Sequence, residues 1–140
     1  MLELSLLRIL KEIQGVTMSN KIYVIQEATA YRDYSSALKY GTLVFLLESK
    51  FRSSRDPQKA LVELREKLKP FRPTDFILWS AGDYLSPILT GIVLAEKKIR
   101  YFNWLKWERT KDSSGQMSGE GYYVPVRVLL NPESLDKPTQ

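Results

Sequence analysis

The segment "TDFILWSAGDYLSPILTGIVLAEKKIRYFNWLKWER", residues 74–109, decides the fold class of this 140-residue chain. Residues 74–80 are rich in apolar and aromatic side chains and predict a strand. Residues 84–98 predict a long helix, and residues 99–109 predict a second strand. Two strands joined by a helical crossover should lie parallel in one sheet. The segment therefore predicts an α/β protein.

The flanking residues continue the alternation of strands and helices. Strands are predicted at residues 21–26 and 42–48, and the second of these is an unbroken apolar run that favours burial on both faces. Helices are predicted at residues 31–41 and 57–69, and a last strand at residues 122–130. The prediction is a single α/β domain with a mixed sheet of about five strands, helices packed on it and a C-terminal antiparallel hairpin.

The last predicted strand follows a loop at residues 110–121. Because Pro125 cannot donate a ladder hydrogen bond, this strand is expected at an edge or with a bulge. Alternation predicts an inward face made of Tyr122, Val124, Val126, Val128 and Leu130.

Three sections of the chain are expected. Residues 18–130 form the α/β domain, and residues 131–140 form a flexible tail. Residues 1–17 are amphipathic, and they predict either a leader helix or a start that belongs at Met18. This leader is too short and too charged to span a bilayer, and its basic face is thin, so no membrane partner is expected.

The composition restricts the chemistry that the chain can perform. It contains no Cys and no His, which excludes disulfides, thiolate metal sites and His-activated nucleophiles. The chain has a net charge of +5. The excess of basic over acidic residues is concentrated in two blocks. Residues 50–55 hold three basic and no acidic residues, and residues 96–111 hold six basic against two acidic residues. No catalytic residue and no cofactor is predicted, and an anionic partner is compatible with the charge.

The ten residues "RYFNWLKWER", 100–109, place large rings on both faces of the predicted strand. Alternation puts Phe102 and Trp104 on one face and Tyr101 and Trp107 on the other. One interpretation is that helices cover both faces and bury these rings. The other is a platform on which single-stranded nucleic acid stacks between cations. Exposure of Trp104 or Trp107 would favour the platform.

Two groups of candidate site residues follow. The residues predicted to contact a partner or nucleic acid are Arg100, Trp104, Lys106, Trp107, Arg109, Lys50, Arg52 and Arg55. Gly82 and Asp83 form a candidate ligand corner where a strand ends and a helix begins. Capping of that helix by Asp83 is the structural alternative.

A carboxylate–metal nuclease is a further alternative. Its candidate ligands would be Asp75, Asp83 and Glu108, with Lys106 as a charge stabiliser. Asp75 and Asp83 flank a predicted strand and would lie about 25 Å apart if that segment is extended, too far to share one ion. No metal site is therefore predicted, and a binding protein is favoured over an enzyme.

An ordered set of short motifs resembles short uncharacterised proteins encoded by tailed bacteriophages. The motifs are "YVIQE", "DYSSALKYG", "LREKLKPFRPTDFIL", "GD" and "IRYFNWLKWER…YYVPVRV", over about residues 21–130. The family's usual "GDP" is "GDY" here, with Tyr84 in the third place. The resemblance implies a phage or prophage origin and a cytoplasmic host setting, and it implies no activity.

These observations predict a small non-catalytic phage-type protein that binds a host protein or a nucleoprotein complex. A module that binds single-stranded nucleic acid through residues 99–109 and 50–55 is the first alternative. The sequence leaves the strand order and the oligomeric state open.

Overall fold

The computed structural model describes residues 20–130, so both predicted terminal sections, 1–17 and 131–140, lie outside it. Five strands form one sheet in the order β2-β1-β3-β4-β5. The first four strands run parallel and β5 runs antiparallel to β4, which confirms the predicted fold class. The strands are β1 (Lys21–Gln26), β2 (Thr42–Leu47), β3 (Phe76–Leu78), β4 (Tyr101–Lys111) and β5 (Met117–Leu129).

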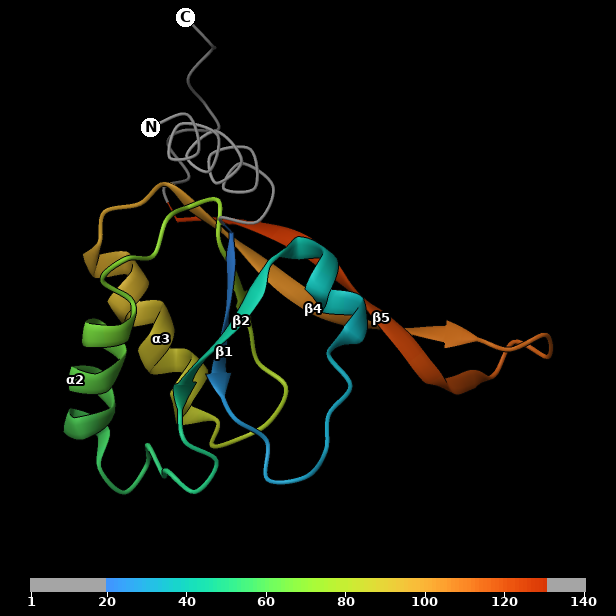
Figure 1. The fold of residues 1–140 in the computed structure, drawn as a ribbon, viewed down its shortest axis with the longest axis horizontal. Helices are drawn as coiled ribbons and strands as arrows, with labels where there is room; N and C mark the ends of the chain where they lie inside the picture. The colour runs from blue at the N-terminus through green and yellow to red at the C-terminus, as the bar shows by residue number, and fades with distance from the viewer. Residues whose placement is uncertain (1–19, 131–140) are drawn as a thin grey trace, which may run out of the picture.

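Helices cover both faces of the sheet. The helices α2 (Pro57–Lys67) and α3 (Leu85–Glu96) lie together on one face, as Figure 1 shows. The 3₁₀ helix η1 (Ser35–Tyr40) lies on the other face, within residues 31–41, where a short helix was predicted. None of the helices formed by residues 20–130 combines the length and the hydropathy that a bilayer span requires.

The side chains of β1 show how the two-sided cover forms the core. Tyr23 and Ile25 point to the face of α2 and α3, and Ile22 and Val24 point to the face where Ala37 of η1 packs. All four β1 side chains are fully buried. A central parallel strand covered on both faces requires this unbroken apolar sequence, and each such side chain stabilises the fold by about 2 kcal/mol.

The helix α2 begins as its sequence predicts, and an ion pair joins it to α3. Asp56 caps α2 by accepting a hydrogen bond from the Lys59 backbone N–H at 3.1 Å, and Pro57 occupies the first helical position. Arg65 of α2 donates two hydrogen bonds, at 3.0 and 2.7 Å, to the Glu96 carboxylate of α3. Because this pair is exposed, it orients the two helices more than it stabilises them.

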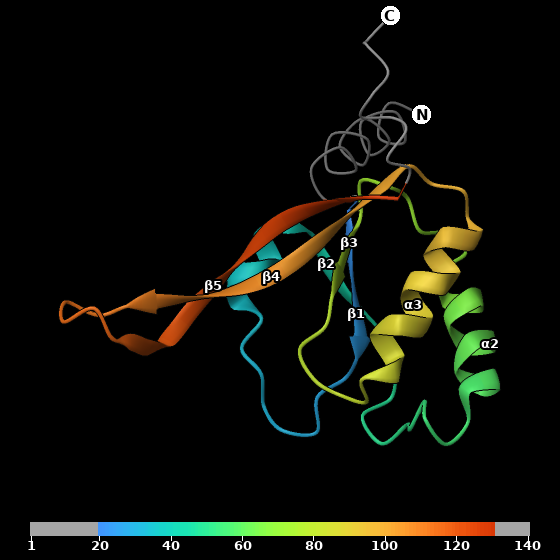
Figure 2. The same cartoon turned by 180° about the vertical axis from the view of Figure 1, so that it is seen from behind.

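The β4–β5 hairpin is longer than the rest of the sheet. β3 pairs only with Asn103–Leu105 of β4, whereas β5 pairs with β4 from Tyr101 to Lys111. Beyond Leu105, β5 is therefore the only strand neighbour of β4 within residues 20–130, and this part of the hairpin projects away from the domain (Figures 1 and 2). We call residues 106–124 the projecting hairpin.

The loop predicted at residues 110–121 is wrong over most of its length, because the ladder continues to the pair Lys111 and Met117. Only a tight turn remains at the tip. There the Asp112 side chain accepts backbone hydrogen bonds from Ser114 at 2.9 Å and Gln116 at 3.0 Å. Gly115 supplies the positive φ, 83°, that this turn needs.

β5 forms an edge of the sheet, as Pro125 predicted. The predicted inward face of this strand is correct near its end, where Val128 and Leu130 pack against the core beneath α3. It is wrong for the part of β5 at the base of the projecting hairpin. There Tyr122 is 45% exposed, and its neighbour Tyr123, on the other face, is buried. The reason is that η1 and the residues before it cover the opposite face of the hairpin base.

Asp75 joins the amino ends of two strands. Its buried carboxylate accepts hydrogen bonds from the backbone N–H groups of Lys21 at 2.9 Å and Arg72 at 2.8 Å. We expect Asp75→Ala to lower the free energy of unfolding by about 3 kcal/mol, because two part-buried backbone N–H groups lose the buried carboxylate that accepts from them. Urea unfolding followed by circular dichroism measures this loss.

Asp33→Ala is the control for this substitution. The exposed Asp33 carboxylate accepts a hydrogen bond from the Ser35 N–H at 2.9 Å, close to it in the chain. Its removal should cost about 1 kcal/mol or less. Equal losses for the two variants would contradict the structural role assigned to Asp75.

Candidate functional site

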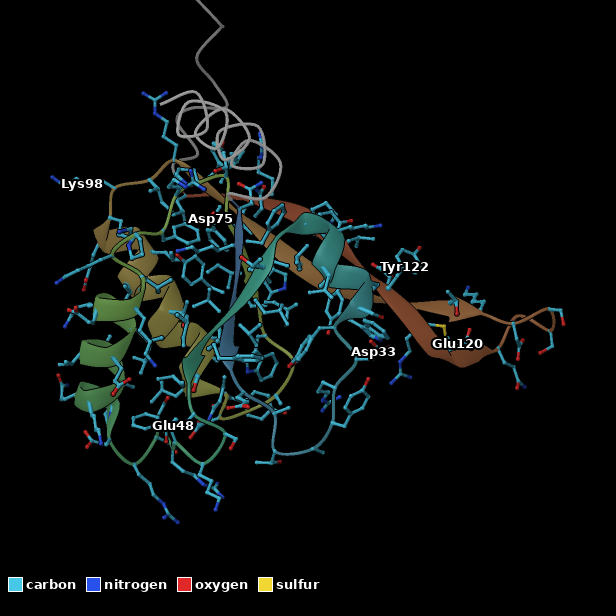
Figure 3. The ribbon with its side chains drawn as sticks, in the orientation of Figure 1. Asp33, Glu48, Asp75, Lys98, Glu120 and Tyr122 are labelled. Carbon is cyan, nitrogen blue, oxygen red and sulfur yellow. The ribbon has the colours of Figure 1, made fainter. Side chains whose placement is uncertain are left out.

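The structure divides the predicted contact residues into two separate groups. Lys50, Arg52 and Arg55 lie in the loop after β2, and the other five residues lie in β4 or directly before it. β2 and β5 are opposite edges of the sheet. Four strand spacings amount to about 19 Å, so the two basic blocks do not form one surface. Figure 3 shows this separation, with Glu48 near the loop and Tyr122 on the hairpin.

The two tryptophans of β4 differ in exposure. Trp104 is half-buried and packs against the core beneath the helices. Trp107 is 40% exposed. Its indole packs edge-on against the Tyr123 ring, with centroids 4.9 Å apart, and lies across Gly121, where any side chain would overlap it. Packing in the core is therefore sufficient to explain the presence of Trp104. Trp107 is held in place by its contacts, yet part of its ring is accessible to solvent.

Exposed cations flank Trp107 on the projecting hairpin. Lys106 forms an ion pair with Glu108 at 2.8 Å, on the opposite face of the strand from Trp107. Arg109 shares the face of Trp107, and both Arg109 and Lys111 are exposed. The hairpin thus presents rings and positive charge together, while Arg100 lies before the start of β4, away from the tip.

A second candidate site lies where the strand order reverses. The chain goes from β1 outward to β2 and then crosses back past β1 to β3. Connections leave β1 and β3 on opposite faces of the sheet, so their carboxyl ends form a crevice, the usual ligand position in open α/β sheets. Gly82 and Asp83, the predicted ligand corner, lie on the β3 side of this crevice.

The buried side-chain amide of Gln26 organises the crevice. Its Nε2 donates to the backbone carbonyls of Glu48 and Phe51. Its Oε1 accepts from the Asp83 backbone N–H and the Ser86 hydroxyl, both at 3.3 Å. All four hydrogen-bonding positions of the amide are therefore used, and the segments after β1, β2 and β3 are held together.

Two serines extend this polar network. Ser86 is buried, and its hydroxyl lies 2.7 Å from that of Ser53, which is also buried. Sequence reasoning missed Gln26, Ser53 and Ser86. A detectable signal was the polar Gln26 at the end of the otherwise apolar run "YVIQ", because a buried amide requires partners.

Gly82 fits against the Gln26 amide. A Cβ at this position would collide with Gln26 Oε1, and the φ of Gly82 is +110°. Only glycine accepts both conditions without strain.

Asp83 has a structural role that the sequence anticipated. Its carboxylate accepts from the Leu85 backbone N–H at 2.9 Å, at the start of α3, so it caps this helix. It also accepts from the Ser54 hydroxyl and, at 3.1 Å, from the Ser54 N–H. The Ser54 hydroxyl, these backbone N–H groups and the Arg52 charge together lower the pKa of Asp83. Its role as a ligand group remains a prediction.

The carboxylates considered for a metal site lie apart. Asp75 is at the amino end of β3, Asp83 follows the carboxyl end of the same strand, and Glu108 is on the hairpin. Among residues 20–130, no three acidic side chains are grouped so that they could hold a metal ion.

Gly82→Ala should lower the free energy of unfolding by about 3 kcal/mol, since it adds backbone strain and displaces a fully bonded buried amide. Gly91→Ala is the matched control, because a Cβ at Gly91 would have nothing within 4 Å. Inside α3 this change should be neutral or stabilise by up to about 1 kcal/mol. Thermal unfolding of both variants measures these changes in stability. If Gly82→Ala did not lower the stability, Gly82 would not be tightly packed against the Gln26 amide.

Asp83 should make stability depend on pH. Its pKa is lower in the folded protein than in the unfolded chain, so its contribution is present above the unfolded pKa, about 4, and is lost as pH falls further. Asp83→Asn should therefore be less stable than the native chain near pH 7, and the difference should shrink toward pH 2. Urea unfolding across this range measures it, and a difference independent of pH would contradict the assignment.

Comparison with known proteins gives one match. A family model described as phage Pam3 gp32-like protein matches residues 20–118, which include the first four strands, α2 and α3. The resemblance to phage proteins is thereby confirmed. None of the curated proteins and none of the solved structures compared with the chain matches it.

Proposed function

This chain belongs to the phage Pam3 gp32-like protein family, and we propose that it is a small non-catalytic binding protein that acts on a host protein or a nucleoprotein complex. The proposed contact surface is the projecting hairpin, and the proposed setting is the host cytoplasm. The rest of the domain then serves as the support that holds the hairpin in place.

The projection of the hairpin is the observation that supports this proposal. β4 and β5 continue beyond Leu105, where β3 ends its pairing, although Tyr123 is the only described side chain of residues 106–124 that is buried in the core. A two-stranded ribbon in water is only marginally stable by itself. This one is reinforced by the Asp112 turn at its tip and the Trp107–Tyr123 contact at its base.

The exposed residues of the hairpin suit a protein contact. Trp107, Tyr122 and Met117 are 40%, 45% and 57% exposed, and Arg109 and Lys111 of the same hairpin are exposed as well. Aromatic residues, Met and Arg are enriched in the centre of interfaces, where a few such anchors carry most of the binding energy. Figure 3 shows Tyr122 on this ribbon near the domain and Glu120 farther toward the tip.

The second candidate function, binding of single-stranded nucleic acid, is favoured by one specific observation. Trp107 is exposed on the same face as Arg109, as a stacking ring beside a cation requires. Against it, Lys106 is already paired with Glu108, and the second basic loop lies at the opposite edge of the sheet. The hairpin alone offers a short track for a phosphate backbone.

Affinity capture from host lysate, with and without nuclease, tests the proposal. We expect a reproducible host protein or nucleoprotein complex on the native chain. The triple variant Arg109→Glu, Lys111→Glu and Tyr122→Ser should lose at least about tenfold of this capture, because each removes an exposed hairpin group. The control variant Lys59→Glu and Lys69→Glu reverses two exposed charges on and directly after α2 and should retain capture.

The outcomes separate the candidates. Capture that survives nuclease and fails with the triple variant supports the protein contact. Direct binding of a labelled oligothymidine, weakening steeply with salt, would support the nucleic-acid alternative instead. Equal capture by the triple variant and the native chain, or no captured partner, would overturn the proposal for the hairpin.

A further inference from the structure

A cleft with a volume of about 500 Å³ opens at the crevice between β1 and β3. Its walls come from the segments that follow β1, β2 and β3, represented by Glu27, Phe51 and Gly82. The volume lies within the roughly 300–1,000 Å³ typical of small-molecule sites. The position is the one where open α/β sheets bind their ligands.

The walls of this cleft are fixed before any ligand enters. Gln26, the last residue of β1, bonds through its side chain to the backbone of the segments after β2 and β3, and the Ser53 and Ser86 hydroxyls join the loop after β2 to α3. A site whose groups are already ordered loses little conformational entropy on binding. Core packing alone would be better served by apolar side chains at these buried positions.

Two of the residues that line the cleft are cations without a direct ion pair among the described residues. Lys50 and Arg52 line it, and neither makes an ion pair or a side-chain hydrogen bond within residues 20–130. Arg52 only lowers the pKa of Asp83, whose oxygens already accept from Ser54 and Leu85. The two cations therefore remain available for an anionic group.

An aromatic ring forms part of the rim. Tyr84 lines the cleft and is 80% exposed, and its ring is held by Trp79, with centroids 5.7 Å apart. A ring this exposed contributes little to core packing. Because it contacts Trp79, it is held in position and its free face can stack on a flat ligand. Glu27, also in the lining and exposed, is an acceptor for ligand hydroxyl groups.

We propose that this cleft is a nucleotide-binding site. The phosphate lies against Lys50 and Arg52, the base stacks on Tyr84, and the sugar hydroxyls donate to Glu27. The N-terminus of α3 takes no part, because Asp83 already occupies it. This site is separate from the projecting hairpin, so the two proposals stand or fall independently.

Isothermal titration of the full chain with adenosine and guanosine 5′-mono- and triphosphates tests the site, with inorganic phosphate and the free nucleosides as separate probes. At least one nucleotide should bind with a Kd below about 1 mM, more tightly than its nucleoside and than phosphate. Quenching of Trp79, the tryptophan in contact with Tyr84, gives an independent signal.

Two variants locate the binding. Lys50→Ala with Arg52→Ala should weaken nucleotide binding about tenfold or more, and Tyr84→Ala should weaken it about fivefold, since these groups are exposed and their removal spares the core. Lys59→Ala with Lys69→Ala is the control and should bind normally. Unchanged binding by the first two variants, equal affinity for inorganic phosphate, or no nucleotide bound at 1 mM would overturn the proposal.

Discussion

One buried amide, that of Gln26, holds the carboxyl end of the parallel sheet together. β1, β2 and β3 end side by side, and the chain leaves β1 toward η1 on one face of the sheet and leaves β2 and β3 toward α2 and α3 on the other, so backbone groups at these ends need partners outside the ladder. Gln26 meets this requirement with four hydrogen bonds to Glu48, Phe51, Asp83 and Ser86. The conformation of Gly82 and the start of α3 both depend on this arrangement, because each is defined by its contact with the amide or with the residue beside it.

Local patterns were sufficient to predict the elements and the class of the fold. The apolar run of β2, the Asp56-Pro57 helix start and the crossover through α3 each encode their own structure within a few residues. The order of the strands depends on contacts between residues far apart, so it could not be derived. The hydrogen-bond network of the crevice could not be predicted for the same reason, since Gln26, Ser53 and Ser86 come from three separate segments.

The hairpin shows where pattern and structure differ. Glycine and serine between residues 110 and 121 predicted a loop, yet an antiparallel ladder needs only backbone partners and tolerates these residues. The exposure of Trp104 and Trp107 could not be ranked from sequence, because it depends on how far the helices extend over β4. The buried Tyr123 was assigned to the wrong face, since the cover from η1 and Tyr34 was not foreseen.

A single stretch of chain connects the two surfaces. Residues 27–34 begin in the cleft, where Glu27 and Thr29 are part of the lining, and end at Tyr34, whose ring stacks on Tyr123 at the hairpin base with centroids 6.5 Å apart. The Tyr34 hydroxyl also lies 2.8 Å from that of Ser80, directly after β3. Should an occupant of either surface shift this stretch, thermodynamic linkage requires a reciprocal effect: each occupant changes the affinity of the other by the same factor.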